Sequence, residues 1–183
     1  TRDMAPRGTH IFFSSRELRH TLGPFLACAA PTVSIAVHDT QNGPVLVCQS
    51  MGSEKTHLHP EEEAFCVMTW PRMAAIPTPT SFSGCLGSCL NTARFTAALQ
   101  KSKGVDFQTR EEGKVQVTFT FEEGKEKAAE VEDSQSVINW RGLSDNPVSC
   151  QVVAFDFHTI ITNMCIGDGV VDITLDPAGR VLM

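Results

Sequence analysis

The sequence predicts an α+β fold of repeated β-α-β-β units, with helices on one face of antiparallel sheets. Three segments share one order of apolar patterns: a period-two stretch, a helical face, a second period-two stretch, a turn and a third stretch. Such a unit cannot cover both faces of its own sheet, so several units must lie side by side. With 183 residues, 42% of them hydrophobic, the chain is long enough for one large or two small domains.

The first segment begins with a strand and a helix that Ser14 or Ser15 can cap. The expected strands are His10–Phe13, Thr32–His38 and Val45–Gln49, with a turn at 39–43. The expected apolar helix face is Leu18, Leu22, Phe25, Leu26 and Ala29. Gly23-Pro24 interrupts that face, so a kinked or split helix is predicted.

The middle segment repeats this order. Its strands are expected at Ser83–Leu90, Val105–Thr109 and Val115–Phe121, with a helix from about Asn91 to Ser102 and a turn at Glu111-Glu112-Gly113. Phe95, Ala98 and Leu99 form the apolar face of this helix. An additional strand at Ala64–Trp70 would extend the sheet between the two segments.

The third segment has the clearest pattern. A strand at Ser149–Ala154 precedes a helix that Asp156 would cap and Gly167 would end. The apolar face of this helix is Phe157, Ile160, Ile161 and Met164. The strands Val170–Leu175 and Arg180–Met183 then flank a tight turn at 176–179.

Charge and cysteine usage limit the class of protein. The net charge of −6 argues against a basic protein that coats nucleic acid, although one basic face within an acidic whole remains compatible. The seven cysteines are odd in number and most lie in apolar runs, which favours reduced thiols in a cytosolic or nuclear protein. Because no apolar run reaches 18 residues, no membrane association is expected, and Thr1–Gly8 lacks a signal-peptide core.

Catalytic and metal motifs are weak. His57 and His59, followed by Glu61–Glu63, suggest a metal site or an enzyme, but their neighbours indicate a solvated loop and no third ligand is fixed by spacing. Cys85 and Cys89 lack zinc-site spacing. Nucleophile-elbow, P-loop and dinucleotide patterns are missing. We therefore expect no enzyme activity, no metal and no cofactor.

The stretch Glu122–Asp145 is rich in charge and poor in apolar periodicity, which predicts a linker. The expected organisation is a first domain at 1–122, an interdomain connector at 123–146 and the start of an incomplete second domain at 147–183. An ordinary α+β domain whose segments look alike by chance is the alternative.

This order of elements resembles the sliding-clamp superfamily, the proliferating-cell-nuclear-antigen-like rings. The helix start Ala154-Phe155-Asp156-Phe157, the stop Gly167-Asp168 and the turn Asp176–Gly179 look like the opening of a clamp's second domain. The resemblance implies clamp-like domains and a non-enzymatic ring subunit in the nucleus. Such a subunit would encircle duplex DNA and tether partner proteins in replication, repair or damage-checkpoint signalling. The other subunits would complete a homo- or heterotrimer.

Candidate DNA contacts follow from this resemblance. The cations expected on the helices are Arg16, Arg19, His20, Arg94, Lys101 and Lys103. They would bind phosphates and not base edges, because a ring must move along DNA; ordinary solvated helix faces are the alternative. The third helix offers only His158, Thr159, Thr162 and Asn163. This favours a divergent relative, such as a subunit of the heterotrimeric DNA-damage checkpoint clamp or a viral processivity factor.

Partner peptides would dock near the end of the connector, where Val137, Ile138 and Trp140 are the expected exposed residues. Trp140 could instead anchor the linker onto the core. The rival function is a small α+β protein–protein interaction or viral structural domain without DNA contact.

Overall fold

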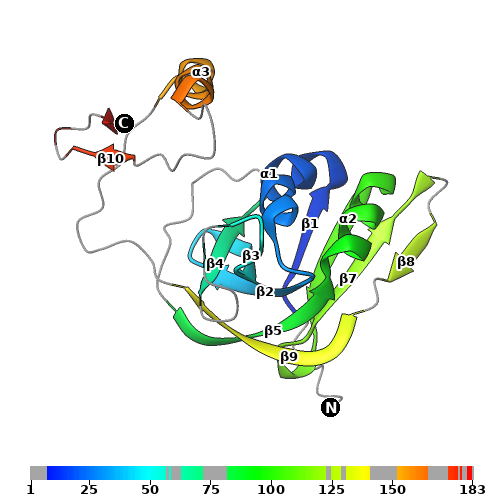
Figure 1. Ribbon diagram of the computed structural model, residues 1–183. Coiled ribbons are helices and arrows are strands. Elements are labelled where there is room, and N and C mark those ends of the chain that lie inside the picture. The colour runs from blue at the N-terminus through cyan, green and yellow to red at the C-terminus, as the bar shows by residue number, and fades with distance from the viewer. Residues whose placement is uncertain are drawn as a thin grey trace, which may run out of the picture. The chain divides into compact units, whose positions relative to one another are not determined.

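The computed structural model describes residues 8–56, 58, 63–71, 82–122, 125–128, 131–140, 152–164, 173–176, 178 and 181–182. It divides into two compact units, Thr1–Gly142 and Leu143–Met183, which are described separately. Figure 1 labels most of the helices and strands.

The first unit contains two antiparallel sheets. Its elements are β1 (His10–Ser14), α1 (Ser15–Cys28), β2 (Thr32–Thr40), β3 (Gly43–Met51), β4 (Ala64–Thr69), β5 (Phe82–Asn91), α2 (Thr92–Lys101), β6 (Gly104–Thr109), the 3-10 turn η1 (Glu111–Gly113), β7 (Val115–Thr120), β8 (Glu126–Ala128) and β9 (Val131–Trp140). The strand orders are β1-β6-β7-β8 and β4-β3-β2-β5-β9. Helices with antiparallel sheets confirm the α+β class at this level.

The segments β1-α1-β2-β3 and β5-α2-β6-β7 exchange their first strands. β1 pairs with β6, with Ser14 opposite Gly104, and β5 pairs with β2, with Asn91 opposite Thr32. The hydrogen bonds at the two helix starts correspond as well. The Ser15 N–H donates to the Lys103 carbonyl and the Thr92 N–H to the Pro31 carbonyl, both at 2.9 Å. Each segment therefore completes the sheet of the other.

α1 and α2 are each capped by the last residue of the strand before the helix. The Ser14 Oγ accepts from the Glu17 N–H at 3.1 Å, and the Asn91 Oδ1 accepts from the Arg94 N–H at 3.0 Å. A kinked or split helix was expected at Gly23-Pro24. The split is wrong, because α1 continues through Pro24, while a kink stays a prediction. Leu18 and Leu22 before Pro24 and Phe25 and Leu26 after it are all buried, so packing holds both halves in one helix.

The main core lies between the helices and the sheets. Its largest fully buried side chains include Phe13, Phe107 and Phe119. The rings of Phe13 and Phe107 pack edge to face, with their centroids 5.8 Å apart. A smaller cluster contains Ala36, Val45, Val47 and Ile138. Because Leu46 and Cys48 of β3 belong to the main core while Val45 and Val47 belong to the smaller cluster, β3 is buried on both of its faces.

The predicted connector contributes strands to these sheets. β8 pairs with β7, and β9 pairs with β5 along most of its length. The register between β5 and β9 shifts twice, between Phe82 and Cys85 and between Ser88 and Cys89. Such irregularities break the period-two alternation of apolar side chains. For this reason β9 could not be predicted as a strand from the apolar pattern of the sequence. A link between two domains at 123–146 stays a prediction.

The second unit contains α3 (Ala154–Met164) and the antiparallel pair β10 (Thr174–Leu175) and β11 (Val181–Leu182). The strand predicted up to Ala154 is wrong at its end, since α3 begins there. The Phe157 N–H already donates to the Val153 carbonyl at 3.0 Å, so Asp156 lies in the first helical turn and is not the cap. The predicted stop at Gly167 and the start of the next strand lie outside the described residues.

None of the residues of α3 is buried, and Phe155 is 76% exposed. Within the described part of the chain, the helices are all too short or too polar to cross a bilayer.

Candidate nucleic-acid interface

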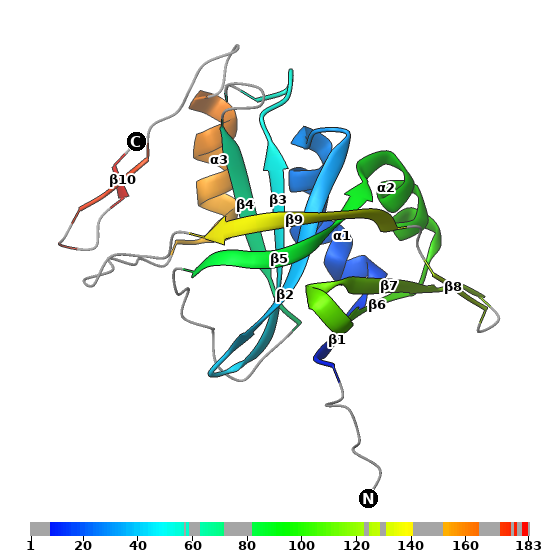
Figure 2. The same cartoon turned by 90° about the horizontal axis from the view of Figure 1, so that it is seen from below.

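Helices α1 and α2 lie side by side and antiparallel on one side of the first unit's sheets (Figures 1 and 2). The start of α1 meets the end of α2 through Ser15 Oγ and Ser102 Oγ, 2.7 Å apart. At the opposite end, the Thr92 hydroxyl donates to the Ala30 carbonyl at 2.6 Å. These hydrogen bonds fix the two helices as one layer.

All six predicted DNA-contacting residues are exposed in this layer or directly after it. Arg16, Arg19 and His20 lie on α1, Arg94 and Lys101 lie on α2, and Lys103 follows α2. Lys103 is beside the start of α1, because its carbonyl accepts the Ser15 N–H. The structure therefore brings together cations that are up to 87 positions apart in the sequence.

Arg19 joins the two helices. Its Nη1 donates to the Leu99 carbonyl at 3.1 Å, near the end of α2. Carbonyls at a helix C-terminus carry partial negative charge, so the guanidinium is favourably placed there. Arg19 is thus both an exposed cation and a link between helices, which the sequence pattern did not indicate.

The charge of the helix layer is opposite to that of the chain. α1 and α2 contain four arginines and lysines against one glutamate, Glu17, which gives +3. The whole chain has a net charge of −6. The helix layer is therefore a basic surface on an acidic protein, and an anionic ligand would be attracted to it.

A shallow groove of about 1230 Å³ lies where the end of α1 meets the start of α2. Several of its lining residues are small: Gly23, Ala27, Ala93 and Ala97. Arg19 also lines it. Small side chains leave the helix surface low at this point, so a phosphate backbone can approach the helices closely.

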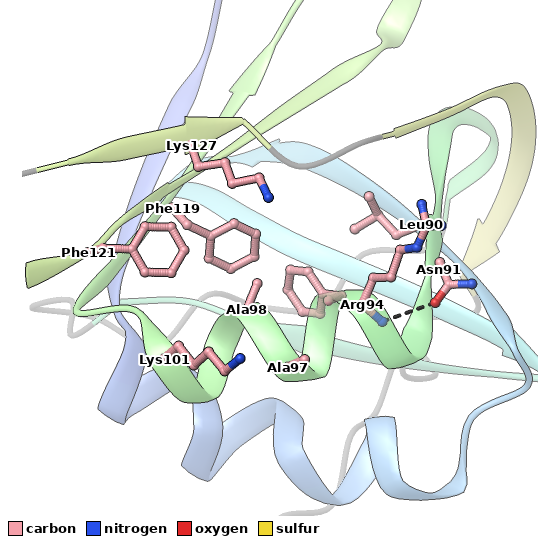
Figure 3. A pocket seen from close by; sticks show the side chains of 10 residues that line it. Leu90, Asn91, Arg94, Ala97, Ala98, Lys101, Phe119, Phe121 and Lys127 are labelled. Carbon is pink, nitrogen blue, oxygen red and sulfur yellow. Dashed lines mark hydrogen bonds between the residues drawn. The ribbon is translucent and has the colours of Figure 1, made fainter.

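A second hollow, of about 570 Å³, lies between α2 and the strands β7 and β8 (Figure 3). Arg94 and Lys101 of α2 and Lys127 of β8 line it together with Phe119 and Phe121. Sequence reasoning missed this site because it assigned Lys127 to a linker. The available signal was the alternation of Phe119 in β7 and Phe121 directly after it.

The predicted partner-docking residues have different surroundings. Val137 is 53% exposed, as expected of a contact residue. Ile138 is fully buried in the smaller apolar cluster, so the expectation that it is exposed is wrong. It points to the opposite face of β9 from Val137, as neighbours in a strand do. Trp140 pairs with Phe82 through the backbone, and its side chain lies outside the described residues.

The residues considered for metal and thiol chemistry are partly described. The described part of the chain contains no group of three His, Cys, Asp or Glu side chains that could hold a metal ion. His57 and His59 lie outside it. Burial raises the pKa of the Cys48 thiol, with a further contribution from Cys66, and burial also raises the pKa of Cys66. Both thiols are therefore protonated and unreactive at neutral pH.

Comparisons with protein-family models, with curated proteins and with solved structures find no match to this chain.

Proposed function

We propose that this chain is a non-enzymatic, sliding-clamp-like ring subunit that encircles duplex DNA and tethers partner proteins. Its role would be in DNA replication, repair or damage-checkpoint signalling in the nucleus. The observation that supports this function is the charge of the helix layer, which is +3 on α1 and α2 in a chain of −6. If α1 and α2 only faced solvent, there would be no reason for positive charge to be concentrated on them in an acidic chain.

Cations on a helix layer suit non-specific contact with DNA. Arginine and lysine side chains neutralise phosphates and release counterions, and this attraction does not depend on base sequence. Interactions of this kind position a protein on the duplex without reading bases, so they permit movement along it. The low surface formed by Ala93 and Ala97 would let the duplex come close to the helices.

The strand exchange supports the clamp-like part of the proposal. Two β-α-β-β segments with corresponding hydrogen bonds at their helix starts would form one clamp-like domain, with both helices on the DNA side. Other subunits would complete a homo- or heterotrimeric ring by adding strands at the sheet ends. Among the described strands, these ends are β1 and β8 in one sheet and β4 and β9 in the other. Partner peptides would bind near Val137.

Charge reversal in the helix layer tests DNA binding. The triple variant Arg16→Glu, Arg19→Glu and Lys103→Glu removes cations gathered where α1 begins and α2 ends. We expect weaker binding to a labelled duplex, measured by fluorescence anisotropy over a salt series. The slope of log affinity against log salt should fall by up to about 0.9 for each phosphate that the variant no longer neutralises.

The matched control reverses three exposed cations outside the helix layer: Arg110→Glu, Lys114→Glu and Lys125→Glu. It changes the net charge by the same amount, and duplex binding should fall much less. Equal reductions in the two triple variants would mean that only the net charge matters. Absence of duplex binding by the native protein would instead favour the α+β interaction domain.

A further inference from the structure

The hollow between α2 and β7–β8 has a rim of cations. Arg94 and Lys101 come from α2, and Lys127 comes from β8 on the other side. Among the described residues that line it there is no carboxylate. Figure 3 shows Lys127 above the phenylalanine rings and α2 below them. A ligand between these elements would meet positive charge from two sides, so it should carry more than one negative charge.

Aromatic rings form the floor of this hollow. Phe95 and Phe119 lie 5.6 Å apart between ring centroids, and Phe119 and Phe121 lie 6.4 Å apart. Phe95 and Phe119 are buried, at 3% and 2% exposure, so they hold the row in place. Phe121 at the end of the row is only partly buried, and its side chain lines the hollow. The floor therefore suits a planar apolar group.

We propose that this hollow binds a nucleoside phosphate unit, presented by single-stranded DNA, with the base on Phe121 and the phosphates at Lys127, Lys101 and Arg94. Proteins that hold single strands combine aromatic stacking platforms with a positively charged path for the backbone. An acidic peptide could satisfy the cations, but it would not need a row of aromatic rings. This inference rests on the proposed DNA-binding function.

The hollow lies next to the helix layer proposed to bind duplex DNA. Arg94 and Lys101 belong to both, since they are exposed cations of α2 and also line the hollow. A strand that leaves a duplex on α1 and α2 would reach the hollow while it stays bound to these two cations. The site therefore fits DNA in which one strand has separated from the other.

Two variants test the site. Phe121→Leu keeps an apolar side chain against the core but removes the aromatic face, and Lys127→Ala removes an exposed cation. Lys114→Ala is the matched control, because Lys114 is exposed at the opposite end of β7 from Phe121. The probes are a labelled oligothymidylate of about 16 nucleotides and an abasic strand of the same length. Thymidine monophosphate serves as a competitor.

We expect the native protein to bind oligothymidylate about tenfold more tightly than the abasic strand, because stacking adds to the charge attraction. Phe121→Leu should remove most of this difference. Lys127→Ala should lower the salt slope by about 0.7, the value for one neutralised phosphate on a single strand. Lys114→Ala should change neither. Competition by thymidine monophosphate at low concentration would identify free nucleotides, and not a strand, as the source of the ligand.

Equal affinity for the intact and abasic strands would overturn the inference, and so would equal competition by an oligoglutamate peptide, since both mean that charge alone is recognised. Duplex binding separates this failure from failure of the proposed function. Phe121→Leu should leave duplex binding unchanged, whereas the Arg16, Arg19 and Lys103 charge reversal should reduce it. A protein that binds duplex but not oligothymidylate keeps the proposed function and excludes the single-strand site; a protein that binds neither excludes both.

Discussion

Gly87 and Gly23 show how the surroundings of a residue decide what its side chain may be. A Cβ added to Gly87 would lie 2.4 Å from the Ile35 carbonyl oxygen and 3.0 Å from Ile138 Cδ1. A Cβ added to Gly23 would have nothing within 4 Å. Gly87 is thus required by the close approach of β2 and β9 to β5, while an alanine side chain at Gly23 would meet no obstacle and would improve the helix propensity of α1.

Substitution of these two glycines should therefore have opposite effects. Gly87→Ala is expected to lower the free energy of unfolding by about 1–3 kcal/mol, because a backbone oxygen blocks the new methyl group. Gly23→Ala should raise the free energy of unfolding by about 0.5–1 kcal/mol, because alanine loses less conformational entropy in a helix. Urea unfolding of both variants measures the two values. A stable Gly87→Ala protein would contradict the close packing at β5.

At the scale of elements, the first two segments were predictable from apolar periodicity. Seven elements begin and end within about two residues of the expected positions, namely β1, β2, β3, β5, α2, β6 and β7. α1 begins at Ser15, as the predicted cap implies. β9 was not predictable, because two shifts of register interrupt its alternation. The hollow beside β8 was missed for a related reason, since Lys127 acquires its role only through pairing opposite Phe119. Pairing between distant strands leaves no local signal in the sequence.

The burial of Ile138 gives a test of β9 as a sheet strand. Ile138→Ala should cost about 2–5 kcal/mol of unfolding free energy, since it opens a cavity beside Val45 and Val47. Val137→Ala is the matched control on the exposed face of the same strand and should change stability by less than about 0.5 kcal/mol. Thermal unfolding measures both. Similarly small changes in stability for the two variants would mean that residues 131–140 behave as a linker and not as a strand of the sheet.

At the scale of the whole molecule, an acidic chain carries a basic helix layer in its first unit. The six cations could be predicted as exposed residues in the helices or directly after them, but their gathering into one layer depends on the pairing of α1 with α2. That pairing follows from the exchange of β1 and β5 between the segments. The candidate interface therefore depends on the topology of the fold, which pairs the two helices, and not on a sequence motif.

The proposed ring requires this chain to assemble with further copies of itself or with other subunits. We expect the native mass, measured by light scattering, to exceed that of the 19.9 kDa chain, either alone or after addition of candidate partner subunits. Edge-strand pairing between subunits would supply the interface. A particle that stays monomeric and associates with neither DNA nor any partner subunit would exclude the ring.

The strand exchange also bears on how the protein acquires its structure. His10 of β1 pairs with Asp106 side chain to side chain at 2.5 Å, although 96 positions separate them. β1 has no partner until β6 has left the ribosome, and the five-stranded sheet is incomplete until β9 has left it. The apolar side chains of the first segment therefore stay uncovered while the rest of the unit is made. Long-range pairing of this kind slows folding and exposes the nascent chain to aggregation. Synthesis of this protein should therefore depend on chaperones that shield the first segment during translation.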